Sequence, residues 1–101
     1  MKQNKLVRDR IPEIIRDNNQ VPVTHVAEEK EYWKKLREKL QEEVNEFLEA
    51  PNEEELADIM EVVFALGKAM GTDRERLETL RKKKHGERGG FENRIILDET
   101  R

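Results

Sequence analysis

The sequence predicts an all-α protein in which two long helices form an antiparallel hairpin within a small bundle of three to four helices. Apolar residues recur every three or four positions along residues 28–49 and again along residues 52–70, as in helices that bury one face. The tripeptides Ala-Pro-Asn at 50–52 and Gly-Thr-Asp at 71–73 are signals that end one helix and begin the next. We expect residues 1–101 to form a single domain, because this length suits one small core.

The N-terminal part predicts one short helix followed by an extended stretch. In KLVRDRIPEIIRDNN, Pro12 is favoured in the first turn of a helix and Asn18 or Asn19 at its end. The next segment, residues 21–26, contains β-branched residues together with Pro22, which cannot donate a hydrogen bond to a neighbouring strand. We therefore expect an extended segment that takes no central place in a sheet.

The two long helices are expected to pack together through apolar stripes. Asn52 is a good N-cap for the second helix, and a tight reversal near Pro51 makes the pair antiparallel. In the second helix Val62, Ala65 and Ala69 continue the broad apolar face round the side. Asp58 falls on that second side one turn before Val62, where an unpaired carboxylate is costly. The first stripe comprises Trp33, Leu36, Leu40, Val44, Phe47 and Leu48, and the broad face of the second helix comprises Leu56, Ile59, Met60, Val63, Leu66, Gly67 and Met70.

The C-terminal part predicts a third helix, a turn and a short extended segment. Thr72 or Asp73 caps the helix RERLETLRKKKH. The following GERGGF is a glycine-rich turn, in which Gly89 and Gly90 would let backbone amides approach an anion. NRIILDE is a short strand candidate, with its extended part at residues 94–98.

Composition indicates a helical protein that gains buried surface from a second chain. Hydrophobic residues make up 35% and charged residues 43% of the sequence, which is apolar-poor for a lone globule. The clear helical periodicity argues against disorder, so we expect a homodimer or homotetramer. The absence of cysteine excludes disulfides and thiolate metal sites. Without a signal peptide or an apolar run of membrane-spanning length, we expect a cytoplasmic protein that does not bind membranes.

Charge is segregated along the chain. Residues 41–66 contain nine acidic residues and no Lys or Arg, whereas the basic residues gather toward the two ends. This pattern suggests an acidic centre that meets cations and basic flanks that meet anions. The basic flanks include Lys5, Arg8 and Arg10 at the N-terminal end and Lys83, Lys84 and Arg88 near the C-terminal end.

Two pairs of carboxylates are spaced to meet between the long helices. Glu43 and Glu46 are three residues apart, as are Glu55 and Asp58, so each pair projects from one side of its helix. The pairings 43 with 58 and 46 with 55 are centred on the same point beside Pro51, which predicts four converging carboxylates in an antiparallel hairpin. Their mutual repulsion is relieved by a divalent cation, and an oxygen-only ligand set selects Mg²⁺, Mn²⁺ or Ca²⁺ over zinc.

Simpler roles exist for several of these residues. Glu55 lies three residues after Asn52 and suits a capping box, and an acidic helix face is most often just solvated. The run RKKKHGER is typical of a solvated or nucleic-acid-attracted segment. His25 and His85 lack the spacing of metal ligands and are expected to be ordinary surface residues.

Four segments, KLVRDRIPEII, EKLQEEVNEFLEA, EELADIMEVV and KKKHGERGGFENRIIL, occur in this order and cover nearly the whole chain. Together with the two acidic pairs on successive helices, they resemble the MazG-like all-α nucleoside triphosphate pyrophosphohydrolases, relatives of phosphoribosyl-ATP pyrophosphohydrolase, and in particular a small house-cleaning branch of that superfamily. The connection of only eight residues between Glu46 and Glu55 is shorter than in many MazG-like proteins. That difference bears on base recognition more than on the acidic pairs.

The resemblance implies hydrolysis of a nucleoside triphosphate at the α–β phosphoanhydride, giving a monophosphate and pyrophosphate. It implies Mg²⁺, or alternatively Mn²⁺, held by Glu43, Glu46, Glu55 and Asp58, and a site built by two or more chains. In such a site one carboxylate, Glu43 or Glu46, would accept the proton of a metal-bound water as the general base. Nucleic acid is not an expected partner. The alternative hypothesis is a non-enzymatic helical module whose basic C-terminal run binds nucleic acid or an acidic protein. Under the MazG-like resemblance, and not under this alternative, a triphosphate is bound by basic and glycine residues from both ends of the chain. These residues are Lys5, Arg8, Arg10, Lys83, Lys84, Arg88, Gly89 and Gly90.

Overall fold

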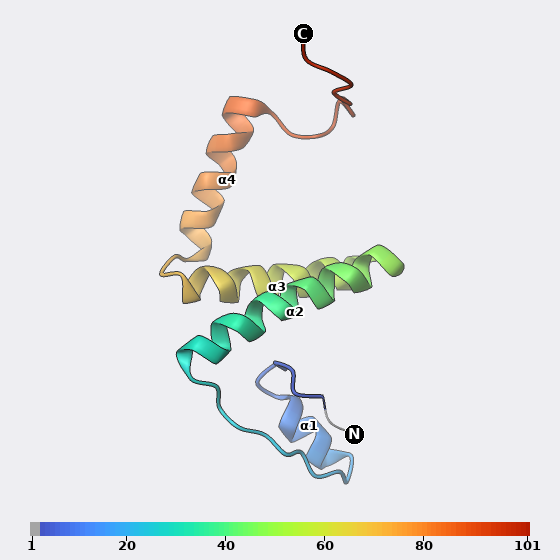
Figure 1. The fold of residues 1–101 in the computed structure, drawn as a ribbon, viewed down its shortest axis with the longest axis vertical. Helices are drawn as coiled ribbons and strands as arrows, with labels where there is room; N and C mark the ends of the chain where they lie inside the picture. The colour runs from blue at the N-terminus through green and yellow to red at the C-terminus, as the bar shows by residue number, and fades with distance from the viewer. Residues whose placement is uncertain (1–2) are drawn as a thin grey trace.

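Four α-helices form the regular secondary structure of residues 3–101, the part of the chain that the computed structural model describes (Figure 1). No strand occurs within these residues, so the all-α prediction is confirmed. No helix in this range is long and apolar enough to cross a membrane. The helices are α1 (Ile11–Asp17), α2 (Glu29–Glu49), α3 (Glu53–Ala69) and α4 (Arg74–Arg88).

The packing of α2 against α3 forms the centre of the molecule. The two helices run in opposite directions and are joined by residues 50–52 (Figure 1). Asn52 fixes this connection, because its Oδ1 accepts a hydrogen bond from the Glu55 amide at 2.9 Å and its Nδ2 donates to the Ala50 carbonyl at 3.0 Å. Leu36 and Val62 are the buried hydrophobic side chains of the described residues, one from each helix.

A glycine-based turn connects α3 to α4. Gly71 adopts a φ of 86°, and the Thr72 amide donates to the Gly67 carbonyl at 2.8 Å, as in a Schellman helix end. Gly67 also permits close packing, since a Cβ atom there would lie only 3.0 Å from Leu77 Cδ1. Asp73 then caps α4 by accepting from the Arg76 amide at 2.8 Å. These contacts fix α4 against the end of α3.

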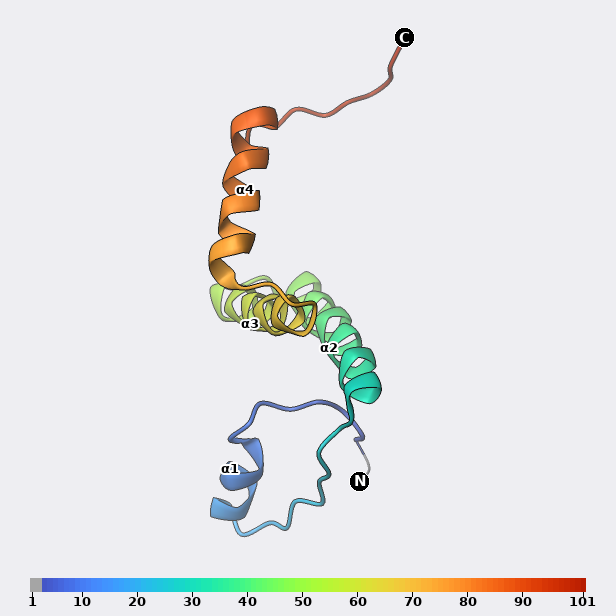
Figure 2. The ribbon, with the colours of Figure 1, turned by 90° about the vertical axis from the view of Figure 1, so that its left-hand side faces the viewer.

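The two outer helices leave the central pair on opposite sides. Figures 1 and 2 show α1 on one side of α2 and α3, with α4 projecting from the other. None of the residues of α4 is buried. The radius of gyration is 17.8 Å, compared with about 13 Å for a compact chain of 100 residues. A single chain is therefore an elongated arrangement around one small packed pair.

The C-terminal segment departs from the prediction. The third predicted helix continues through Gly86 to Arg88, and Gly89, at a φ of 82°, ends it, so GERGGF is only partly a turn. The strand expected in NRIILDE does not form, because an isolated strand has no neighbour with which to pair its backbone groups. Residues 21–26 likewise pair with no strand. Ile95, Ile96 and Leu97 remain about four-fifths exposed.

The apolar face predicted for α3 is divided in the structure. Val62, which we placed at the side of that face, is buried against α2, whereas Leu56, Met60 and Val63 are 49%, 55% and 38% exposed. These three residues follow one another at helical spacing and form an apolar stripe on the surface. The broad apolar face of α3 is therefore only partly covered within one chain, with Gly67 buried and Ile59 and Leu66 half-buried.

Replacement of Asn52 by Ala should lower the free energy of unfolding by about 1 kcal/mol, because it removes the oxygen that caps α3. Urea unfolding followed by circular dichroism measures the loss. Asn52→Ser keeps a side-chain oxygen and is the control, which should remain close to the wild type. An equal loss in both variants would show that the cap does not stabilise the connection.

Candidate metal centre

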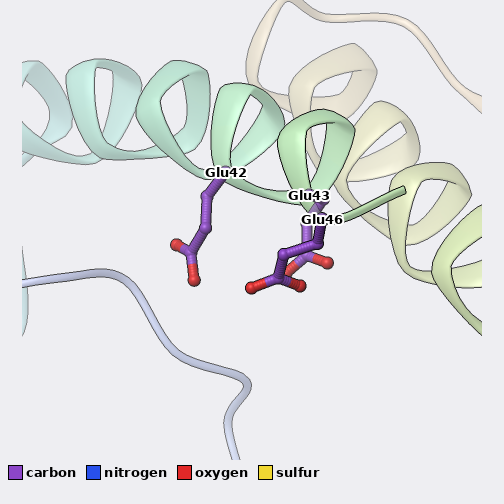
Figure 3. A group of neighbouring side chains, drawn as sticks. All are labelled: Glu42, Glu43 and Glu46. Carbon is purple, nitrogen blue, oxygen red and sulfur yellow. The ribbon is translucent and has the colours of Figure 1, made fainter. Parts of the chain in front are cut away.

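The end of α2 presents three carboxylates on one side. Glu42, Glu43 and Glu46 all project toward the side on which the N-terminal coil lies (Figure 3). Each contributes an oxygen that lies within 4.8 Å of an oxygen from the other two. Glu43 is 6% exposed, whereas Glu46 is exposed to solvent. Two side chains one turn apart on the same helix therefore differ sharply in their access to water.

The start of α3 brings two more carboxylates to the same place. Oxygens of Glu43, Glu55 and Asp58 also lie within 4.8 Å of one another. Glu43 belongs to both groups, so the predicted pairs from α2 and α3 meet around it. We call Glu43, Glu46, Glu55 and Asp58 the acidic cluster. The α2–α3 connection places its members within reach of one another, as the symmetric spacing about Pro51 predicts.

Two oxygens of the acidic cluster are buried without a hydrogen-bond partner. They are Oε2 of Glu43 and Oε2 of Glu55. Buried polar atoms are normally satisfied, and leaving a charged one unpaired costs free energy. Although the Glu55 amide donates to Asn52, its carboxylate lies with Glu43 and Asp58. The orphan oxygens make the space between α2 and α3 a candidate site for a positively charged ligand.

The pKa values of Glu43 and Glu55 also reflect the crowding of negative charge in the acidic cluster. Burial raises the pKa of Glu43, as do the charges of Glu46 and Asp58, while a hydrogen bond from Lys39 acts in the opposite direction. The pKa of Glu55 is also raised, first by burial and then by the charges of Glu46, Asp58 and Glu43. Both carboxylates are therefore harder to ionise than a solvated glutamate. A bound divalent cation would reverse this tendency by favouring the ionised form.

Basic side chains partly offset the negative charge. Arg8 Nη2 donates to Asp58 Oδ1 at 2.7 Å. Lys39 Nζ lies 3.3 Å from Glu43 Oε1 and 3.5 Å from Glu42 Oε2. Arg8 was predicted to bind the triphosphate, whereas Lys39 and Glu42 were not predicted as residues of the site. The available signal was the spacing of Lys39 four residues before Glu43 on one helix, which favours an ion pair.

The remaining predicted phosphate-binding residues are distributed unevenly. Lys5 Nζ reaches Glu42 Oε1 at 3.3 Å and so lies beside the acidic cluster. Arg10 instead pairs with Glu13 of α1 at 3.4 Å. The C-terminal set is not brought to the cluster within one chain, because α4 begins at the opposite end of the α2–α3 pair from the 50–52 connection (Figure 1). That set is Lys83, Lys84, Arg88, Gly89 and Gly90.

The ligand set fits a hard divalent cation. The acidic cluster offers carboxylate oxygens alone, which suit Mg²⁺, Mn²⁺ or Ca²⁺. The buried Oε2 atoms of Glu43 and Glu55 supply unpartnered donor atoms at this place. The residues that would hold the ion are Glu43, Glu55 and Asp58, with Glu46 beside them.

Comparison with known proteins adds one partial relative. An uncharacterized protein of Mycolicibacterium smegmatis is 52% identical over 42 residues, which is 42% of this chain and 43% of that protein. The match therefore spans less than half the length of either chain. No family model matches the sequence, and no solved structure matches it.

Millimolar Mg²⁺ or Mn²⁺ should stabilise the protein against thermal unfolding, because a cation that binds the assembled cluster favours the folded state by mass action. At a hundredfold excess over its Kd the expected gain is about 2.7 kcal/mol. Differential scanning fluorimetry checks this. Monovalent salt at equal ionic strength is the control, since screening alone also relaxes crowded carboxylates. Equal stabilisation by the two salts would contradict a specific metal site.

Proposed function

We propose that the protein is a Mg²⁺-dependent nucleotide pyrophosphohydrolase that cleaves a nucleoside triphosphate to a monophosphate and pyrophosphate. The observation that carries this proposal is the meeting of Glu43, Glu55 and Asp58, whose carboxylates each have an oxygen within 4.8 Å of the others, with the Oε2 of Glu43 buried and unpartnered. The resemblance of four ordered segments to the MazG-like superfamily supports the same activity. A carboxylate-held Mg²⁺ commonly completes its coordination with substrate phosphates, which favours phosphate chemistry over other uses of such a site.

The side chains of the acidic cluster have different environments that suit different roles. Glu43, Glu55 and Asp58 would hold the cation, which when bound neutralises phosphate charge and makes a water molecule more acidic. Glu46 is solvent-exposed and adjacent to Glu43, so it is placed to accept a proton from an attacking water. Glu43 is held by Lys39 and is nearly inaccessible. We therefore assign the general base to Glu46.

Basic residues near the cluster would hold the triphosphate. Lys5 and Arg8 already lie on the acidic side of the α2–α3 pair through their contacts with Glu42 and Asp58. Their cationic groups would stabilise charge that develops on the leaving pyrophosphate. The charge-assisted contacts of a guanidinium with phosphate oxygens also supply orientation.

We further propose that the working unit is a homo-oligomer. Leu56, Met60 and Val63 form an exposed apolar stripe on α3, and a second copy that covers it would add the buried surface that one chain lacks. In such an assembly the basic residues of α4, remote from the acidic cluster of their own chain, would be available to a neighbouring cluster. Sedimentation or light scattering measures the oligomeric state directly.

Asp58→Asn and Glu55→Gln should each abolish Mg²⁺-dependent pyrophosphate release while the helix content stays unchanged, because each removes a ligand charge and also relieves repulsion. The assay incubates the protein with a panel of canonical and damaged nucleoside triphosphates. Glu61→Gln and Glu54→Gln are matched controls on α3, since both residues are exposed and outside the cluster. Full activity in Asp58→Asn would disprove the metal assignment.

A second candidate function follows from the position of α4. This helix has no buried residue, and its basic residues in RKKKHGER are exposed and lie away from the acidic cluster. A solvent-exposed basic helix suits binding to nucleic acid or to an acidic protein. The protein would then act as a non-enzymatic binding module through this segment.

Arg88→Ala separates the two functions. If Arg88 contacts the triphosphate, the substitution should lower kcat/KM about tenfold or more, the effect of losing a charge-assisted contact worth about 1.5–3 kcal/mol. If α4 binds nucleic acid, turnover should be unchanged and a salt-dependent association with DNA or RNA should weaken. Arg76→Ala, at the other end of α4, is the control. Unaltered turnover with lost nucleic-acid binding would favour the binding module.

A further inference from the structure

The N-terminal coil is fastened across the acidic side of the central helices. Three contacts hold it: Lys35 Nζ donates to the Asn4 carbonyl at 2.8 Å, Lys5 pairs with Glu42 at 3.3 Å, and Arg8 pairs with Asp58 at 2.7 Å. We call residues 4–8 the N-terminal strap. Its first two contacts lie on α2 and its last on α3. The strap therefore bridges both helices that carry the acidic cluster.

Arg8 is paired with Asp58, one of the residues that we propose as metal ligands. Asp58 uses Oδ1 to accept from Arg8, and the same carboxylate belongs to the group with Glu43 and Glu55. A guanidinium and a divalent cation on one carboxylate would lie close enough to repel each other. Arg8 and the cation are thus alternative partners for Asp58.

Arg8 differs from Lys39 in its freedom to leave. The Arg8 side chain is 56% exposed and comes from a coil fifty positions away in sequence from its partner. The Lys39 side chain is 17% exposed and lies on the same helix as Glu43. Lys39 remains beside Glu43 whatever occupies the cluster, whereas Arg8 can swing into solvent or onto a ligand.

We propose that Arg8 exchanges partners, leaving Asp58 when a divalent cation binds the acidic cluster and then binding the triphosphate. This inference rests on the proposed function and assigns Arg8 as an internal competitor of the cation as well as a phosphate-binding residue. Guanidinium groups form strong paired hydrogen bonds with phosphate oxygens, so the released side chain has a suitable new partner. Binding of the cation and release of Arg8 from Asp58 are then coupled, and the coupling acts equally in both directions.

Calorimetric titration with Mn²⁺ alone tests the competition. Arg8→Ala should bind Mn²⁺ about three- to tenfold more tightly than the wild type, because it removes an exposed ion pair and a nearby like charge. Arg10→Ala is the matched control, since Arg10 pairs with Glu13 outside the cluster, and its Mn²⁺ affinity should match that of the wild type. In nucleotide turnover, Arg8→Ala should instead raise KM.

The possible results are distinguishable. Wild-type protein that binds no Mn²⁺ would overturn both the proposed function and this inference. Wild-type protein that binds Mn²⁺, with equal or weaker binding by Arg8→Ala, would overturn the partner exchange alone, because Arg8 would then stay on Asp58 beside the cation. Tighter binding by Arg8→Ala and Arg10→Ala alike would also overturn it, since the effect would then come from net charge.

A second measurement follows the strap itself, with Arg8→Ala as the reference. The backbone amide NMR signals of residues 4–8 in the wild type should shift on addition of Mg²⁺ toward their positions in Arg8→Ala, where the Arg8–Asp58 contact is absent. Signals of α4, which does not contact the strap (Figure 2), are the internal reference. Strap signals that stay fixed at saturating Mg²⁺ would overturn the proposal.

Discussion

Repulsion among carboxylates at the end of the α2–α3 pair is the constraint around which the other features are arranged. Packing these helices buries Leu36 and Val62, and the same packing brings Glu43 to Glu55 and Asp58. Hydrophobic contact and electrostatic repulsion are therefore produced by one interface. Lys39 and Arg8 offset part of the charge, yet two buried oxygens stay without partners. Such local cost is typical of a site kept for binding rather than for stability.

The central helices could be predicted because their signals are local. The capping oxygen of Asn52, the glycine at position 71 and the apolar periodicity each act within a few residues, and the observed helix bounds lie within a residue or two of the expected ones. The meeting of Glu43 with Glu55 and Asp58 also follows from spacing alone, once the chain reverses near Pro51. Structural features that depend on residues close together in the chain can therefore be predicted from the sequence.

The features that sequence analysis missed depend on tertiary contacts. The share of the broad apolar face of α3 that one chain buries was not predicted: Gly67 is buried, whereas Leu56 and Met60 stay exposed. An apolar face wider than one partner can cover has more than one way to pack. The strand expected at residues 94–98 needs a neighbour, and the chain offers none within the described residues. The Arg8–Asp58 contact spans fifty positions in sequence, and no periodicity predicts such a contact.

The distance between the acidic cluster and α4 links the proposed chemistry to the proposed assembly. A triphosphate carries several negative charges, and carboxylates repel it unless cations between them offset that charge. Within one chain Lys5, Arg8 and Lys39 are the basic residues in contact with this region among residues 3–101, and all three are engaged with acids. A bound divalent cation would add positive charge to the acidic cluster, and an Arg8 side chain released from Asp58 could bind the phosphates. A neighbouring α4 would change it further, so an assembly that covers the stripe of Leu56, Met60 and Val63 would serve both stability and substrate binding.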